Sequence, residues 1–284
     1  MATNAAGCRN HRCRGTSELK KVFSGTLIVL ITFNMIVLAH ADTIRLYAAG
    51  SLRAALTDVT KAYESTSPNK LEAKYGPSGL LKNEIVTGAK ADVFASANME
   101  HPQALHNEKK SGPVVRFARN KLCALATPGL RVDNASLLER MLDPNVKLGT
   151  STPKADPSGD YAFEVFTKAE TIKPGARAAL ENKALQLTGG ANSATPPAGR
   201  TVYGWHVVEG RADIFLTYCT NALAALKENP EQQIVGLPDN LAVGADYGLT
   251  VISGASSAAQ EFADFMMSSA GQEILVGHGF ASGK

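Results

Sequence analysis

Short apolar runs alternate with amphipathic segments along most of this chain. The stretches from Thr43 to Ala48, Leu71 to Tyr75 and Asp92 to Ala97 are rich in apolar residues and have the length of strands. Between them, Leu52 to Tyr63 carries apolar residues at helical spacing, and Gly79 to Thr87 fits a short helix. Strands that alternate with helices favour parallel sheets covered by helices, so the pattern predicts an α/β fold.

The alternation continues to the C-terminus. Further predicted strands are Lys121 to Ala126, Val146 to Gly149 and Ala212 to Tyr218, and further predicted helices are Tyr161 to Glu170, Val202 to Glu209 and Ala258 to Leu275. The segment from Gly189 to Gly199 contains two adjacent prolines and predicts a surface loop. The length that remains after the signal segment suits either one large α/β domain or two lobes of ordinary size, and we favour two lobes. We expect residues 42–122 plus 240–284 to form lobe 1 and residues 123–239 to form lobe 2.

The first 41 residues have the pattern of an export signal. Basic residues from Arg9 to Lys21 precede an apolar run from Gly25 to Leu38, and Ala39-His40-Ala41 has the form of a cleavage site. The apolar run is too short for the roughly 20 residues that span a bilayer. We therefore expect a signal peptide over residues 1–41, with an uncleaved N-terminal anchor as the alternative.

The net charge of the chain after the signal segment limits the kind of ligand or partner that we expect. The signal segment holds five of the 29 basic residues and one of the 26 acidic residues, so the remaining chain carries 24 and 25 and is close to neutral. Nucleic-acid binding normally leaves a clustered basic surface, so we expect no nucleic-acid partner. A small anion remains a suitable partner, because neutral dipoles can hold it.

Two cysteines remain after the signal segment, Cys123 and Cys219. They are far apart and lack the spacing of zinc ligands, so we expect no zinc site. In an oxidising compartment the two can pair, but each lies in an apolar run, which fits buried free thiols at least as well. The sequence leaves both states open.

Three serines lie where a predicted strand ends and a helix begins. Ser51 follows Gly50, Ser78 precedes Gly79, and Ser158 stands between Pro157 and Gly159. Small neighbours allow close approach to the backbone, and a helix start offers unpaired N–H groups with a positive dipole end. Each serine alone fits an ordinary N-cap. Three of them at the carboxyl ends of strands indicate an anion site, because open α/β sheets bind ligands at those ends.

Several runs, in order, resemble the periplasmic molybdate-binding proteins of ABC transporters, and they cover nearly the whole chain after the signal segment. These runs are Ile44 to Leu52, Tyr75 to Leu80, Ala91 to Ala97, Phe117 to Leu122, Gly210 to Tyr218, and Gly271 to Leu275 with Gly279-Phe280.

The resemblance implies a two-lobed clamshell of the periplasmic-binding-protein type (type II), each lobe a mostly parallel sheet flanked by helices. It implies that Ser51 and Ser78 donate hydroxyl and amide hydrogen bonds, that Ser158 offers its backbone amide, and that Tyr218 donates its phenolic hydroxyl. These groups would contact the oxygens of molybdate or tungstate and would not ligate the metal directly. The resemblance further implies a periplasmic, monomeric protein without cofactor or catalytic step, which delivers its ligand to an ABC permease.

Other functions remain beside this one. Arg200 lies in the loop region that aligns poorly with the family, and an arginine in the cleft would favour a different anion, such as sulfate or phosphate. An exported α/β hydrolase is the main enzymatic alternative. Ser78 does not fit the G-x-S-x-G pattern of its nucleophile, and the histidines lie outside recognisable motifs, so we do not favour it. A structural or adhesive exported domain would leave the serine turns unexplained.

Overall fold

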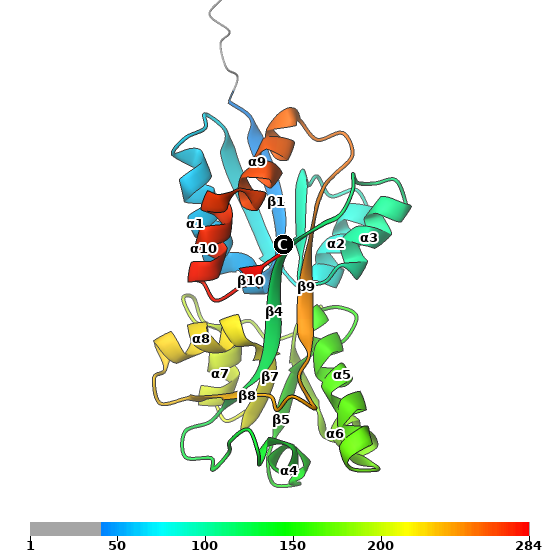
Figure 1. The fold of residues 1–284 in the computed structure, drawn as a ribbon, viewed down its shortest axis with the longest axis vertical. Helices are drawn as coiled ribbons and strands as arrows, with labels where there is room; N and C mark the ends of the chain where they lie inside the picture. Colours follow the sequence, from blue (N-terminus) through cyan, green and yellow to red (C-terminus); the bar gives the residue numbers. More distant parts are fainter. Residues whose placement is uncertain (1–40, 284) are drawn as a thin grey trace, which may run out of the picture. The chain divides into compact units, whose positions relative to one another are not determined.

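The computed structural model describes residues 41–283, and these belong to one compact unit. The predicted signal peptide lies almost entirely outside the described residues. Within them, no helix is both long and apolar enough to cross a membrane. Ten strands form one continuous curled sheet in the order β2-β1-β3-β9-β4-β7-β5-β6, with β8 and β10 paired to β4 (Figure 1).

The first lobe contains both ends of the described chain. Its strands are β1 (Thr43–Ala49), β2 (Lys70–Gly76), β3 (Val93–Ser96), the first half of β4 (Val115–Ala126), β9 (Gly244–Val251) and β10 (Ala281–Ser282). Its helices are η1 (Gly50–Leu52), α1 (Arg53–Glu64), α2 (Ser78–Val86), α3 (Glu100–Asn107), α9 (Ser257–Met267) and α10 (Ser269–Gly277). β2, β1 and β3 run parallel, and β9 runs antiparallel between β3 and β4.

The second lobe is built from the middle of the chain. Its strands are the second half of β4, β5 (Leu148–Ser151), β6 (Leu185–Thr188), β7 (Ile214–Tyr218) and β8 (Gln233–Gly236). Its helices are α4 (Leu137–Leu142), α5 (Pro157–Ile172), α6 (Ala176–Lys183), α7 (Val202–Val208) and α8 (Cys219–Glu228). β6, β5 and β7 are parallel, and β4 pairs antiparallel with β7 and β8. In both lobes most strands therefore share one direction, as the fold class predicts.

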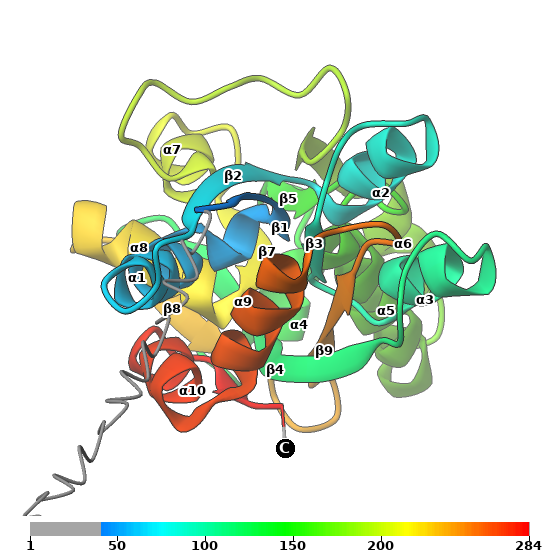
Figure 2. The same cartoon turned by 90° about the horizontal axis from the view of Figure 1, so that it is seen from above.

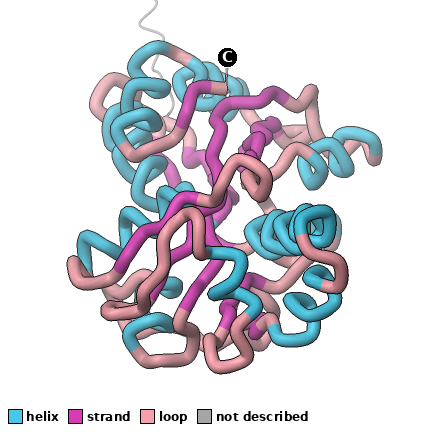
Figure 3. Tube along the Cα trace, turned by 60° about the horizontal axis from the view of Figure 1, so that its bottom comes forward, coloured by secondary structure: helices cyan, strands magenta, loops and turns pink. Residues whose placement is uncertain are grey.

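Helices cover both faces of the first lobe's sheet, and the alternation of side chains along the strands explains why. Val93 packs in the cluster that includes Leu56 of α1 and Phe262 of α9. The next residue, Phe94, packs with Leu81 of α2 and with α3 on the other face. Successive strand residues point to opposite faces, so a strand that is apolar throughout requires helices on both sides. Figures 2 and 3 show the strands in the interior and the helices outside. The strand ends are therefore the places where a ligand can reach the sheet.

Two elements differ from the sequence-based expectation. The predicted helix from Ala258 to Leu275 is two helices, because Ser268 ends α9 and its Oγ accepts the Gly271 N–H at 3.2 Å as the N-cap of α10. The predicted strand from Lys121 to Ala126 begins earlier, at Val115. Its first half contains Arg116 and Arg119, which both pair with Asp246. These charged residues interrupt the apolar pattern, so the pattern does not predict the first half of the strand.

Candidate ligand-binding site

Ser51 and Ser78 lie at the carboxyl ends of two neighbouring parallel strands. In the register of β1 and β2, Ala49 pairs with Gly76, the last residue of each strand. Ser51 follows in η1, and Ser78 is the first residue of α2. The predicted strand-to-helix turns are present, and they place both serines at one edge of the first lobe's sheet, where open α/β sheets bind ligands.

Ser158 and Tyr218 occupy the matching edge in the second lobe. β5 and β7 are parallel neighbours; Tyr218 is the last residue of β7, and Ser158 lies in the first turn of α5, after β5. The Ser158 side chain is fully buried, and its Oγ has no hydrogen-bond partner among the described residues. A buried hydroxyl without a partner calls for an explanation, and at a helix N-terminus a bound anion supplies one.

The backbone of Ala97, which directly follows β3, connects these two edges. The Ala97 N–H donates to Ser78 Oγ at 3.1 Å, and the Ala97 carbonyl accepts from the Tyr218 hydroxyl at 3.2 Å. Close by, the Gly79 N–H donates to the Ala155 carbonyl at 2.9 Å, in the segment that leads into α5. The structure thus brings Ser78, Tyr218 and the start of α5 together.

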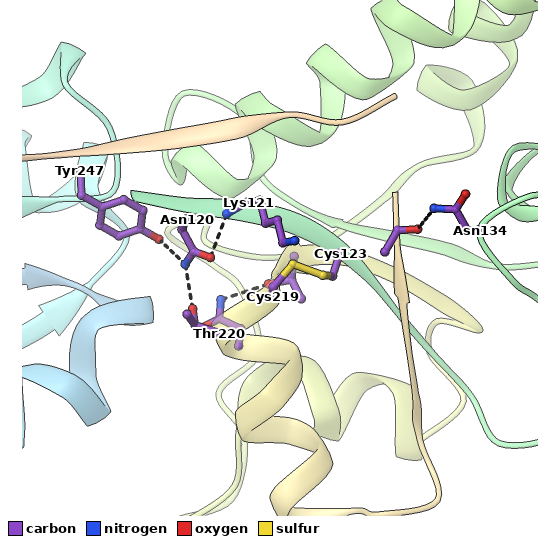
Figure 4. Close-up of a disulfide and its surroundings, with 10 residues drawn as sticks. Asn120, Lys121, Cys123, Asn134, Cys219, Thr220 and Tyr247 are labelled. Carbon is purple, nitrogen blue, oxygen red and sulfur yellow. Dashed lines mark hydrogen bonds between the residues drawn. A yellow bond between two sulfur atoms is a disulfide. The ribbon is translucent and has the colours of Figure 1, made fainter. Parts of the chain in front are cut away.

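Ser51 joins this group through Tyr247 of β9. Ser51 Oγ lies 3.0 Å from the Tyr247 hydroxyl, and the Tyr247 ring centroid lies 5.5 Å from that of Tyr218. Asn120 of β4 donates to the Tyr247 hydroxyl at 3.3 Å and to Thr220 Oγ1 at 2.8 Å (Figure 4). The sequence gives no signal for Tyr247, because a buried tyrosine in an apolar strand has the pattern of a core residue. Asn120 lies in a family-like run, which assigns it no contact.

The tyrosines at this place remain neutral hydrogen-bond donors. Burial raises the pKa of Tyr218 and of Tyr247 well above the ordinary value. The Ser51 and Asn120 side chains lower the pKa of Tyr247 in part. The hydroxyls around Ala97 therefore present dipoles and no charge over the physiological pH range.

The Ser158 amide, a predicted donor, faces a carboxylate in the structure. Asp156 is the N-cap of α5, and its Oδ1 accepts the Ser158 N–H at 3.1 Å. Burial raises the pKa of Asp156 to about 6, although the Ser158 amide and the Ser151 hydroxyl act to lower it. An anion at this helix start has to share the amide with Asp156.

Arg200 is held at the far end of α8. Its Nε lies 3.5 Å from Glu228 Oε2, and the neighbouring Thr201 N–H donates to Glu228 Oε1 at 2.7 Å. Glu228 is the last residue of α8, and Tyr218 directly precedes the first. Ten residues at 1.5 Å each separate the two ends by roughly 15 Å. The contacts of Arg200 are therefore those of a loop cation.

Cys123 and Cys219 form a disulfide, which settles the alternative that the sequence leaves open. Their Cα atoms are 4.9 Å apart, and the bond joins β4 to the first residue of α8 (Figure 4). Of the two states left open, the alternative of buried free thiols, which the sequence fits at least as well, is not the one present, because β4 and β7 pair so that Cys123 lies opposite Thr217, close to Cys219. The bridge fixes the residue that follows Tyr218.

A pocket of about 240 Å³ lies next to the segments that carry Ala97 and Ser158. Its lining includes Asn98, which follows Ala97, and Pro157, which precedes Ser158. Glu100, Asp160 and Asp246 make its wall acidic, so an anion fits better among the neutral donors next to it. Within residues 41–283, no group of three or more His, Cys, Asp or Glu side chains is arranged to hold a metal ion.

Two lobes joined by shared strands, with polar groups of both lobes close together at the carboxyl ends of their parallel strands, define a binding protein of the periplasmic type. The chain belongs to the bacterial extracellular solute-binding protein family, whose model matches residues 44–281. An uncharacterised protein of Pasteurella multocida is 35% identical over 210 residues, which are 74% of this chain and 87% of the relative. The molybdate-binding protein ModA of Haemophilus influenzae is 24% identical over 278 residues, covering 93% and 99%. The resemblance inferred from the sequence runs is confirmed.

Solved structures show the same fold. The periplasmic molybdate-binding protein of Azotobacter vinelandii matches 84% of this chain and 98% of its own with a TM-score of 0.66 at 18% identity. The sulfate-binding protein SubI of Mycobacterium tuberculosis matches 86% and 87% with a TM-score of 0.67 at 17% identity. The two-lobed fold predicted from the sequence is confirmed.

Proposed function

We propose that this chain is an exported, high-affinity binding protein for molybdate or tungstate. The anion binds between the lobes, to the hydroxyls of Ser51, Ser78 and Tyr218 and to the backbone amide of Ser158, and the loaded protein delivers it to an ABC permease. The protein binds and releases its ligand unchanged, without a cofactor. One observation carries the proposal: Ser78 from the first lobe and Tyr218 from the second both hydrogen-bond to the backbone of Ala97, and Ser51 joins them through Tyr247, which packs against Tyr218.

Neutral donors suit this task. Fixed hydroxyls and amides stabilise a tetrahedral oxyanion in a site that excludes water, and they leave no uncompensated buried cation when the site is empty. Hydrogen bonds to a charged group contribute about 1.5 to 3 kcal/mol each, so several together support tight binding. Because contacts come from both lobes, the ligand favours the state in which the lobes are together.

Sulfate is the second candidate, and one comparison favours it: the sulfate-binding protein SubI has a similar fold. Both candidates are tetrahedral dianions, so the same set of neutral donors can hold either. The placement of Arg200 at Glu228 speaks against a charged contact in the site, and the sequence relationship to ModA favours molybdate.

Isothermal titration calorimetry of residues 42–284 with molybdate, tungstate, sulfate and phosphate tests the proposal. We expect submicromolar Kd values for molybdate and tungstate and at least ~100-fold weaker binding of sulfate and phosphate, about 2.7 kcal/mol in binding free energy. Tight binding of sulfate alone would assign the second candidate. Heat from none of the four anions would refute oxyanion binding.

The same proposal includes the lobes, the location and the state of assembly. Residues 42–122 plus 240–284 form lobe 1 and residues 123–239 form lobe 2, with the boundaries in β4 and before β9. Residues 1–41 direct export and are removed, and the mature protein is a periplasmic monomer. Mass spectrometry of the protein from the periplasmic fraction, with Asp42 expected at its N-terminus, tests cleavage. Light scattering tests the monomer.

A further inference from the structure

The start of α5 carries a charge that an oxyanion has to meet. The Ser158 N–H donates to Asp156 Oδ1 at 3.1 Å. An anion oxygen bound to the same N–H would lie about 3 Å from that nitrogen. The anion and the carboxylate would then share one donor as two negative groups in contact. Two acids in such a position do not both stay ionised.

Packing holds Asp156 in this position. A Cβ added to Gly189, which follows β6, would lie only 2.5 Å from the Asp156 Cβ, so the backbone of the loop after β6 presses against this side chain. The Asp156 N–H donates to the Thr152 carbonyl at 3.0 Å, and its carbonyl accepts from Gly159 at 2.8 Å. A swing of the carboxylate away from the helix would disturb this packing, whereas a proton on the carboxylate leaves it in place.

We propose that Asp156 takes up one proton from solvent when the oxyanion binds, a role that rests on the proposed function. One oxygen of the neutral carboxyl still accepts the Ser158 N–H as an N-cap. The new O–H can donate a hydrogen bond to an oxygen of the anion. Asp156 thereby changes from a competitor of the anion into a further neutral donor, and it sets how affinity depends on pH. The unpartnered Ser158 Oγ, fully buried at the same helix start, points independently to a ligand there.

The surroundings of Asp156 favour this protonation. Asp160 of α5 repels its ionised form, and the phenols of Tyr203 from α7 and Tyr218 from β7 interact electrostatically with it. Burial raises the pKa of both phenols, so they stay neutral. The Ser151 hydroxyl of β5 acts in the opposite direction and lowers the pKa of Asp156 in part. Burial already raises the pKa of Asp156 to about 6, and a bound anion raises it further.

Calorimetric titrations of the mature protein with molybdate and with sulfate from pH 6 to pH 8.5 test the proposal. Each titration is run in two buffers with different heats of ionisation, which gives the number of protons taken up. For the wild type we expect Kd to fall by up to ~10-fold for each unit of pH lowered above about pH 6.5, the limit for one proton. The expected uptake approaches one proton per anion in that range.

Asp156→Asn and Asp160→Asn separate the two acids that could accept the proton. Asn is isosteric with Asp and caps helices well, so both variants should fold. Asp160, in the first turn of α5, is the matched control because its Oδ1 likewise accepts a backbone N–H, that of Lys154 in the segment before the helix, at 2.8 Å. We expect Asp156→Asn to bind at pH 8 at least ~10-fold more tightly than the wild type, with Kd nearly independent of pH. Asp160→Asn should keep the wild-type slope.

The possible results distinguish a failure of the role of Asp156 from a failure of the proposed function. Binding that is independent of pH in the wild type, without proton uptake, would overturn the role of Asp156 and leave the proposed function standing. A slope that persists in Asp156→Asn would do the same. Failure of both anions to bind at every pH would overturn the proposed function and the role of Asp156 with it.

Discussion

Among single residues, the hydroxyls of Ser51 and Ser78 offer the sharpest test of the site. Replacement of either serine by alanine removes one hydrogen-bond donor, and a hydrogen bond to a charged group contributes about 1.5 to 3 kcal/mol. We therefore expect Ser51→Ala and Ser78→Ala each to weaken molybdate binding by at least ~10-fold in calorimetry. Ser65→Ala is the control, because its hydroxyl donates to the Ala62 carbonyl at the exposed end of α1. Wild-type affinity in either site variant would show that serine to be structural only.

The raised pKa of Asp156 also predicts how the stability of the ligand-free protein depends on pH. Because burial raises its pKa to about 6 in the folded protein, the folded state binds a proton that the unfolded state has lost between about pH 4 and pH 6. Stability contributed by this group is present at low pH and falls as pH rises through about 6. Asp156→Asn should therefore unfold at a higher temperature than the wild type at pH 8, but not at pH 4. Equal Tm differences at both pH values would contradict this assignment.

At the scale of elements, the Cys123–Cys219 disulfide connects β4 with α8 across 96 residues of sequence. A closed loop of that length restricts the unfolded chain, and such bonds typically contribute about 2 to 4 kcal/mol. We expect the double variant Cys123→Ala, Cys219→Ala to lose that much free energy of unfolding in urea titrations. Reductant should lower the wild type to the same level and leave the double variant unchanged. Equal stability of oxidised and reduced wild type would refute the contribution.

Several elements with a strong local signal were predictable, whereas the pairing of the strands was not. β1 and α1 follow from the periodicity of Leu46, Leu56 and Val59, because burial on one face leaves a regular pattern. β9 was not among the predicted strands, although its apolar residues at 245, 247, 249 and 251 alternate with glycine and polar residues as in a strand. Its place between β3 and β4 follows only from pairing with strands far away in the sequence.

The same division applies to the candidate site. Ser51, Ser78 and Ser158 lie in strand-to-helix turns that can be recognised in the sequence from their small neighbouring residues. Tyr247 reaches Ser51 from 196 positions away, and only the fold brings the two together. The carboxylate of Asp156 on the Ser158 amide could be suspected from its N-cap position, but its burial depends on Gly189 in a distant loop.

At the scale of the whole described unit, Gly79 controls how closely the lobes approach. A Cβ at this position would lie 2.2 Å from the Lys154 carbonyl oxygen and 2.9 Å from that of Ala155, both backbone atoms of the other lobe. We expect Gly79→Ala to hold the lobes apart and to weaken molybdate binding by at least ~10-fold, because contacts from one lobe are lost.

The stability of the ligand-free Gly79→Ala variant should be unchanged or higher, since alanine favours the helix α2. Gly277→Ala is the control: it lies in α10, and its added Cβ meets no atom within 4 Å. Small-angle scattering with and without molybdate should show compaction of the wild type and of Gly277→Ala but not of Gly79→Ala. Wild-type affinity in Gly79→Ala would show that tight contact between the lobes is unnecessary.

The position of β9 also bears on when the chain can fold. β9 is among the last strands to be synthesised, yet it lies in the interior of the first lobe's sheet, between β3 and β4. Until residue 251 has left the ribosome, β3 and the first half of β4 each lack this neighbour in the sheet, and the apolar face of α9 is also missing. The sheet of the first lobe can therefore be completed only after almost the whole chain has been synthesised, because strands made early wait for a partner made late.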